Sequence, residues 1–377
     1  MYEMNHAEVN AVRKVILSRK LFRYQAGGRG ECDRFEREFV RKLRARNAIL
    51  VSSGTNALVA GLVAAGVGPG DEVLVPAYTF VATAAAVLLA GARPVVVNVD
   101  EGLGLSVKDA RSRITARTRA IIPVHMDGLA ADLHGILQLA RRHRLVVIED
   151  CAQALGGSYR GRRLGTWGDV GGFSLNENKI LSCGEGGIVA TRRPELYEKL
   201  FCLQDLSARY NPVKAPLLGS ARLLGMSMRV SEIQGAIMRV QLTRLDSLLS
   251  RLRARKRRMV AGLEDLPGIS VIRGHCVPGD CGSSLHLRVE DPSRAALLSR
   301  RLLAAGIPAT FPSLRPAHVA WKWLGEIEPK GRAAALAELV PSMEIMMTVL
   351  KLDLDPSRTL AETDRLARDM RRTILAG

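Results

Sequence analysis

Residues 145–153 read LVVIEDCAQ, an apolar run that ends in two acidic side chains. A short continuous apolar run with polar residues at its end is typical of a strand buried on both faces of a sheet. Similar runs precede it, at 72–76 (EVLVP), 94–97 (PVVV) and 120–124 (AIIPV). Segments of helical length and apolar spacing lie between the runs, at 55–66, 80–91, 107–113 and 132–143. This alternation predicts βαβ crossovers and an α/β fold, with a mostly parallel sheet covered by helices on both faces.

The pattern changes after about residue 241. A long helical pattern continues to Leu263 and is ended by Pro267 and Gly268. Shorter strand-like and helical pieces follow, at 269–272, 284–289, 293–305 and 360–375. We therefore expect a large domain over residues 31–241, joined through a continuous helix to a smaller α+β domain over residues 242–377. Residues 1–30 are expected to pack on the small domain or on a partner subunit.

The chain is strongly basic. Its 377 residues include 55 Lys and Arg against 37 Asp and Glu, a formal net charge of +18. The dense basic run at 251–258 follows leucines at helical spacing, which is typical of a solvated helix face. No zinc-finger spacing or RNP-type motif accompanies it, so nucleic acid is not expected as a partner. The charge would also suit an anionic substrate or an acidic carrier protein.

The cysteines and the apolar segments indicate the compartment. The six cysteines form no C-x-x-C pair and no Cys/His grouping with zinc spacing, and they are too sparse for a disulfide scaffold. The opening residues carry charges where the apolar core of a signal peptide would lie. The longest apolar stretch, 80–99, is interrupted by Gly91, Arg93 and Pro94, which argues against a membrane span. We expect a reduced, cytoplasmic protein without a metal site.

Two motifs offer binding groups at the ends of strands. In SSGTNA (52–57), Gly54 and Thr55 open a helix, where free backbone N–H groups and the helix dipole favour an anion. Ser and Thr are also ordinary helix caps, so this motif alone is ambiguous. Asp150 ends a buried strand, where a carboxylate must be paired, hydrated or bound to a cation. A metal ion shared with His125, a protonated cofactor nitrogen and a simple surface position all fit it.

A third motif contains a lysine. Lys179 follows the strand-like segment 170–174 and precedes the glycine-rich turn GEGG (184–187). A lysine removed from water has a lowered pKa and can form a Schiff base, whereas an exposed loop lysine has no such role. The Walker pattern is absent, which excludes that type of nucleotide-binding loop. Pyridoxal 5′-phosphate explains the three motifs together, with phosphate at the helix start, ring nitrogen at Asp150 and aldehyde at Lys179.

Six motifs occur in an order that resembles the DegT/StrS family of pyridoxal-phosphate aminotransferases. They are SGTNAL (53–58), GPGDEVLVPAYTF (68–80), GARPV (91–95), IEDCAQALGG (148–157), GDVGGFSLNENK (168–179) and GEGG (184–187). The resemblance continues more loosely through MRVSEIQGA (228–236) and AAGIPATFPSLRPAH (304–318). It implies fold type I, with a large domain built on a mostly parallel sheet and a smaller α+β C-terminal domain. It also implies a homodimer with shared active sites.

The resemblance assigns roles to individual residues. Lys179 would form the aldimine with the cofactor and Asp150 would hold the pyridine nitrogen. The other cofactor-binding positions would be Gln153 near the ring hydroxyl, Phe80 stacked on the ring, and Gly54, Thr55 and Ser174 at the phosphate. Ser227 stands where the family usually has an Asn that reaches the neighbouring subunit's phosphate. No role follows for His125, His286 or His318.

The resemblance also implies a reaction. The chain would move an amino group from L-glutamate or L-glutamine to a ketone of a sugar, cyclitol or related intermediate, by a ping-pong mechanism through Lys179. The presence of Lys179 argues against the sugar dehydratases of the family, which have a His in its place. Two alternatives remain open, namely a related enzyme acting on a non-sugar or carrier-tethered ketone, and a non-catalytic regulator that binds the cofactor. Substrate contacts are expected from residues 209–225 and from the small domain.

Overall fold

The computed structural model describes residues 3–24, 29–206, 223–311 and 331–376. Most of the expected substrate loop at 209–225 lies outside the described residues, and so does His318. A seven-stranded sheet in the order β1-β9-β8-β5-β4-β2-β3 forms the centre of the large domain. β9 is antiparallel to both of its neighbours, and the other pairs are parallel. The strands are β1 (Asn47–Val51), β2 (Glu72–Pro76), β3 (Arg93–Val97), β4 (Thr118–Ile121), β5 (Val146–Asp150), β8 (Val170–Ser174) and β9 (Gly187–Thr191).

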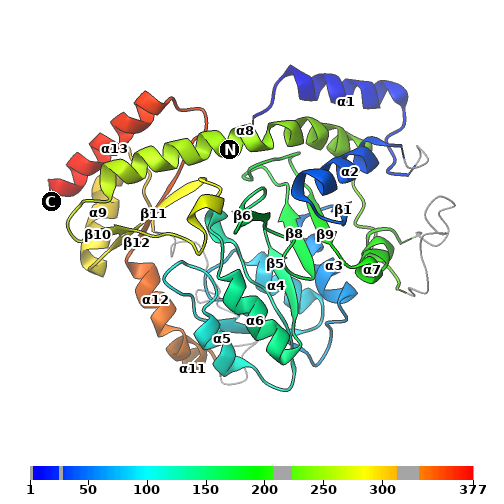
Figure 1. The fold of residues 1–377 in the computed structure, drawn as a ribbon, viewed down its shortest axis with the longest axis horizontal. Coiled ribbons are helices and arrows are strands. Elements are labelled where there is room, and N and C mark those ends of the chain that lie inside the picture. The colour runs from blue at the N-terminus through cyan, green and yellow to red at the C-terminus, as the bar shows by residue number, and fades with distance from the viewer. Residues whose placement is uncertain (1–2, 25–28, 207–222, 312–330, 377) are drawn as a thin grey trace.

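Helices cover both faces of this sheet (Figure 1), so the predicted α/β fold is confirmed. Alternate strand residues face opposite sides: Val73 and Val75 pack into one apolar cluster and Leu74 into another. The helices on one face are α3 (Gly54–Ala64), α4 (Ala82–Leu89) and α7 (Pro194–Gln204). Those on the other are α2 (Glu31–Leu43), α5 (Val107–Arg113), α6 (Leu133–His143) and part of α8 (Glu232–Leu263). The short β6 (Ser158–Tyr159) and β7 (Arg162–Arg163) form a separate pair.

One predicted strand is shorter than expected. The sequence predicted a strand over 120–124, but β4 ends at Ile121. Pro123 has no N–H to donate and interrupts the ladder. Pairing resumes only as an isolated bridge between Val124 and Asp150, and the His125 N–H donates to the Asp150 carbonyl oxygen at 3.0 Å. The chain therefore leaves the sheet beside Asp150 and enters a short turn, Met126–Gly128.

The small domain is built on a three-stranded antiparallel sheet, in the order β10-β11-β12. Figure 1 shows the long helix α8 running from the side of α1 and α2 to the side of this sheet and α13. It spans the expected boundary at residue 241 without a break. The N-terminal helix α1 (His6–Ser18) packs on α8, where Arg244 pairs with Glu8 at 2.7 Å. The remaining elements are β10 (Ile269–Val271), β11 (Ser284–Val289), α9 (Pro292–Ala304), α11 (Gly331–Glu338), α12 (Val340–Met347), β12 (Val349–Asp353) and α13 (Leu360–Leu375).

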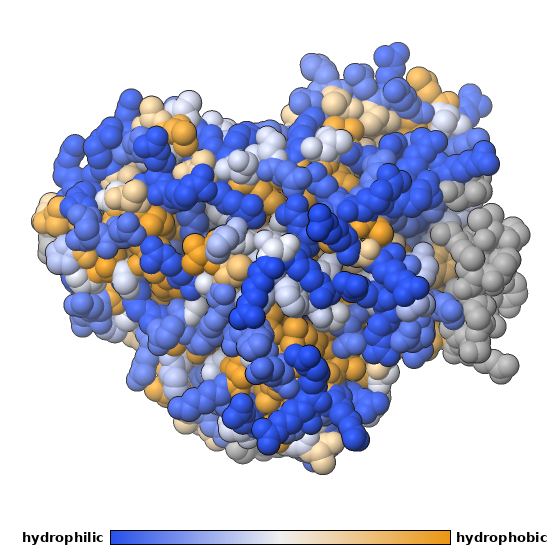
Figure 2. Space-filling view, in the orientation of Figure 1, coloured by the Kyte–Doolittle hydropathy of each residue, from blue (hydrophilic) through white to orange (hydrophobic). Residues whose placement is uncertain are grey.

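The surface agrees with the charged composition. The face drawn in Figure 2 is mostly hydrophilic, with separated hydrophobic areas between the charged side chains. Among the helices that the structure describes, none combines the length and the apolar character that crossing a membrane requires.

Candidate active site

The start of α3 forms one end of the site. Ser53 caps the helix, and its hydroxyl accepts a hydrogen bond from the Asn56 N–H at 3.0 Å. Within the described part of the chain, the N–H groups of Gly54 and Thr55 make no hydrogen bond. A Cβ on Gly54 would lie 2.8 Å from Cβ of Ser174, so glycine is required for β8 to approach the helix this closely. Gly54, Thr55 and Ser174 therefore lie together and suit a phosphate group.

Asp150 lies at the carboxyl end of β5, near the middle of the sheet, and is 5% exposed. One carboxylate oxygen accepts a hydrogen bond from Thr83 Oγ1 at 2.8 Å, and the other accepts one from the Ala152 N–H at 3.0 Å. Burial raises the pKa of Asp150, although these two hydrogen bonds and the charge of Lys179 oppose the shift. A buried carboxylate with so few donors is well suited to a protonated ring nitrogen.

Lys179 lies in the turn after β8, where its backbone N–H donates to the Asn176 carbonyl oxygen at 3.1 Å. Burial lowers the pKa of its amine, although the charges of Asp150 and Asp127 oppose the shift. Among the residues that the structure describes, none forms a hydrogen bond or an ion pair with this amine. A half-buried amine without a partner is available for covalent chemistry.

The other predicted site residues are Gln153, Phe80 and Ser227, and they differ in their contacts with the residues described above. Gln153 accepts a hydrogen bond from the Asp127 N–H at 3.1 Å, which leaves its amide N–H groups for another acceptor. Phe80 is 59% exposed and lies just before α4, the helix that carries Thr83. Ser227 is exposed and has a φ of 52°. No hydrogen bond between described residues joins Ser227 to the phosphate end of the same chain.

The model of the DegT/DnrJ/EryC1/StrS aminotransferase family matches residues 3–371. The chain belongs to this family. It is 37% identical over 349 residues to a dTDP-3-amino-3,4,6-trideoxy-alpha-D-glucose transaminase of Streptomyces venezuelae, which covers 91% of this chain and 88% of that one. It is 38% identical over 219 residues to an L-glutamine:2-deoxy-scyllo-inosose aminotransferase of Streptomyces kanamyceticus, over 56% of this chain and 51% of that one. The crystal structure of 3-amino-5-hydroxybenzoic acid synthase matches with a TM-score of 0.89 and 26% identity, covering 100% of this chain and 98% of that chain.

This member of the DegT/DnrJ/EryC1/StrS family is therefore an aminotransferase of fold type I, and its cofactor is pyridoxal phosphate. The described residues fit that cofactor. The free N–H groups at the start of α3 suit its phosphate, the buried carboxylate of Asp150 suits its ring nitrogen, and the free amine of Lys179 suits its aldehyde.

His125 has a structural place in this aminotransferase. Its Nδ1 accepts a hydrogen bond from the Ala131 N–H at 3.2 Å, so the proton lies on Nε2, which donates to Glu149 at 3.2 Å. Glu149 also accepts hydrogen bonds from three backbone N–H groups, those of Gly165, Trp167 and Gly168. His125, Glu149 and Cys151 bring possible ligand atoms within 4.8 Å of one another. The carboxylate oxygens already have hydrogen-bond donors, and burial raises the pKa of the Cys151 thiol far above its usual range, so this trio favours a hydrogen-bonded core over a metal centre.

Replacing Glu149 by glutamine is expected to destabilise the protein by about 3 kcal/mol. The buried amide NH2 of glutamine would face backbone N–H groups, so donors would meet donors without an acceptor between them. Thermal unfolding of the apoprotein measures the effect. The control is Gln138→Glu on the exposed side of α6, which also interconverts Glu and Gln but at a solvated position. Glu149→Gln is expected to bind pyridoxal phosphate normally at low temperature. A variant of unchanged stability that lost the cofactor would show that Glu149 serves the site directly.

The structure adds residues to the site that the motifs did not reveal. Thr83 supports Asp150, and Asp127 is joined to Gln153. Asp127 in turn pairs with Lys351 of β12 and with His286 of β11, both in the small domain. Asp127 and Lys351 are 224 positions apart in the chain, so no local pattern could have connected them.

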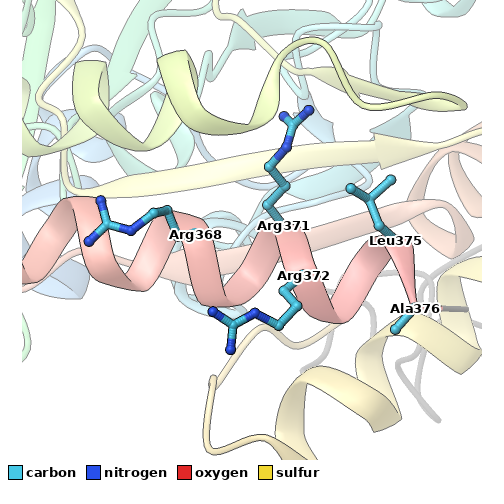
Figure 3. A pocket seen from close by; sticks show the side chains of 5 residues that line it. All are labelled: Arg368, Arg371, Arg372, Leu375 and Ala376. Carbon is cyan, nitrogen blue, oxygen red and sulfur yellow. The ribbon is translucent and has the colours of Figure 1, made fainter.

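A basic depression lies away from these residues, at the end of α13. It has a volume of about 460 Å³ and is lined by Arg368, Arg371, Arg372, Leu375 and Ala376 (Figure 3). Figure 3 shows the three arginines leaving the helix in different directions. Arg371 forms an ion pair with Asp265. Because the guanidinium groups do not converge and the depression is open, it is a poor site for a specific anion.

Proposed function

We propose that this aminotransferase moves an amino group from L-glutamate or L-glutamine to a ketone of a sugar, a cyclitol or a related biosynthetic intermediate. The proposal depends above all on one observation, the unpartnered amine of Lys179 in the electrostatic field of the buried Asp150. The relatives are named transaminases and aminotransferases, so the non-catalytic alternative is not favoured.

We infer that Gly54, Thr55 and Ser174 hold the phosphate of the cofactor, that Phe80 lies against its ring and that Gln153 donates to its ring hydroxyl. When bound, pyridoxal phosphate supplies a ring that accepts the electron pair left on the amino donor's α-carbon. Asp150 contributes by holding a proton at the ring nitrogen, which requires its carboxylate to be ionised. The bound cation restores that ionisation, since an opposite charge lowers a carboxyl pKa.

Lys179 then has two tasks in turn. It is the attachment point of the cofactor, and once an amino donor releases it, its amine takes the proton from the donor's α-carbon. Burial favours the neutral amine, which is the form that acts as a base. The same amine returns a proton when the ketone is aminated, so donor and acceptor would use one site in alternation with ping-pong kinetics.

The choice of substrates is supported by the relatives. One is a transaminase of a nucleotide-linked deoxysugar and another is a glutamine-dependent cyclitol aminotransferase. The basic character of the chain, with a net charge of +18, also suits an anionic acceptor such as a nucleotide-linked sugar.

The experiment that tests the proposal follows the visible absorbance band of the protein-bound cofactor. Addition of L-glutamate or L-glutamine to the purified protein is expected to remove this band, and a suitable keto-sugar or keto-cyclitol is expected to restore it. D-Glutamate is the matched control and is expected to leave the band unchanged. Loss of the band with neither L-amino acid, but with another amine, would show that the donor assignment is wrong.

We further propose that the enzyme works as a homodimer in which Ser227 reaches the partner's phosphate site. Large apolar side chains remain exposed on a single chain, among them Leu89 (67%) and Leu224 (84%). Ser227 is exposed on a single chain, so its side chain is accessible to a partner subunit. Sedimentation of the active enzyme measures its mass, and a fully active monomer would exclude the shared site.

A further inference from the structure

The turn Met126–Gly128 lies between the two domains and is held by both. Asp127, at its centre, has a φ of 52°, a left-handed conformation that Asp adopts more readily than most residues. Its carbonyl oxygen accepts a hydrogen bond from Ser283 Oγ at 2.8 Å. A Cβ on the next residue, Gly128, would lie 2.7 Å from Cβ of Cys281. The segment of the small domain around residues 281–283 therefore packs directly on this turn.

The carboxylate of Asp127 is held still more firmly. Lys351 Nζ donates to Oδ1 at 2.6 Å, while His286 Nε2 and the Tyr78 hydroxyl donate to Oδ2 at 3.0 and 3.2 Å. Lys351 and His286 belong to the small domain, and Tyr78 follows β2 of the large domain. Burial alone would raise the pKa of Asp127, but the hydrogen bonds and charges of His286 and Lys351 hold it well below its usual range. Asp127 is thus a buried, ionised residue whose carboxylate is restrained by three donors.

The backbone N–H of Asp127 points to the cofactor site, because it donates to Oε1 of Gln153 at 3.1 Å. An amide whose oxygen is engaged in this way keeps its N–H groups for another acceptor, which under the proposed function is the ring hydroxyl. We propose that Asp127 is a positioning residue, which transmits the placement of the small domain to Gln153 and so fixes the donor that Gln153 offers to the cofactor. This inference depends on the role of Gln153 under the proposed function.

A spectroscopic property of the bound cofactor should report this positioning. A hydrogen bond from Gln153 stabilises negative charge on the ring oxygen, which lowers the pH at which the visible absorbance band titrates. The charged groups that act on Lys179 are Asp150, Asp127 and Lys351. Asp127 therefore has two effects of opposite sign: its charge raises the titration midpoint, and its hold on Gln153 lowers it. Variants have to separate the two.

Tyr78→Phe makes the separation without changing any charge, because it removes one donor to Asp127 and leaves Asp127, His286 and Lys351 in place. Tyr78→Phe is expected to raise the pH midpoint of the visible band, as Gln153→Ala does. It is expected to have no effect on the midpoint in a protein that already carries Gln153→Ala. Asp127→Asn keeps a residue that tolerates the left-handed backbone. The shift in midpoint caused by Asp127→Asn is expected to differ by about half a pH unit or more between the wild-type and the Gln153→Ala backgrounds. Such non-additivity is the mark of two residues that act through one another.

The test is a pH titration of the visible band in the holoenzyme, without substrates, for the single and double variants. Asp353→Asn is the matched control, since Asp353 also contacts Lys351, at 3.2 Å, but is 67% exposed and lies outside the connection to Gln153. It is expected to shift the midpoint equally in both backgrounds. Equal shifts for Asp127→Asn in the two backgrounds, or no shift for Tyr78→Phe, would overturn the inference and leave the proposed function intact. A wild-type protein that forms no visible band with pyridoxal phosphate would overturn both.

Discussion

Replacement of Lys179 by alanine is expected to reduce the rate of the donor half-reaction by about a thousandfold or more. The amine of Lys179 is both the attachment point and the proton carrier under the proposed mechanism, and a positioned acid or base alone contributes about a hundred- to ten-thousandfold. Stopped-flow absorbance with L-glutamate or L-glutamine measures the half-reaction directly. Because burial lowers the pKa of the amine in the wild type, the variant is expected to fold at least as stably.

Two further variants make this result specific. Lys179→Arg keeps a positive charge but has no amine that deprotonates near neutral pH, so it is expected to be as inactive as the alanine variant. Lys108→Ala removes an exposed lysine on α5 and is expected to retain full activity. An alanine variant at position 179 that turned over at the wild-type rate, with an unchanged visible band, would contradict the assignment.

Replacement of Asp150 by asparagine is expected to lower the rate about a hundred- to a thousandfold, the range found when one preorganised electrostatic group is lost from an active site. In the protein without its cofactor, the same change is expected to raise the free energy of unfolding near neutral pH. The folded-state pKa of Asp150 lies above its ordinary value of 3.8 because the carboxylate is buried. Its contribution to folding is therefore fully present below the unfolded pKa and is lost as the pH rises through the folded pKa.

The apoprotein of Asp150→Asn should consequently gain stability relative to the wild-type apoprotein as the pH rises from about 4 toward neutrality. With pyridoxal phosphate bound the order should reverse, since only the carboxylate pairs with the ring nitrogen. Thermal unfolding of both proteins, with and without the cofactor at several pH values, checks the reversal. The same order of stability in both states would mean that Asp150 does not contact a cation in the loaded enzyme.

The sequence was a good guide wherever the signal was local. The apolar runs predicted the parallel strands, and the helix after Ser53 was visible from its capping residues and spacing. Asp150 and Lys179 were candidates because Asp150 ends one predicted strand and Lys179 follows another. In a parallel sheet the carboxyl ends of the strands meet at one edge, so such residues converge.

The rest depended on contacts between distant segments. The strand β12 was not predicted, because VLKLD (349–353) is short and its register is set by pairing with β11. Asp127 lies in a turn whose sequence, HMDG (125–128), carries no strong pattern, and its importance comes from Lys351 and His286 in another domain. The sequence left the role of His125 open, and its hydrogen bonds place it in the core.

The long helix α8 has a consequence for how this enzyme could be recombined with its relatives. Its 32 residues extend for about 48 Å, and its two halves serve different neighbours. The first half holds the N-terminal helix through Arg244 and Glu8, and the second half holds the C-terminal region through Arg255 and the Arg358 carbonyl oxygen. One residue inserted between them would turn one half by about 100° relative to the other. A chimera that joins the large domain of one enzyme to the small domain of another must therefore preserve the helical phase of α8 to the residue, whatever the sequence at the junction.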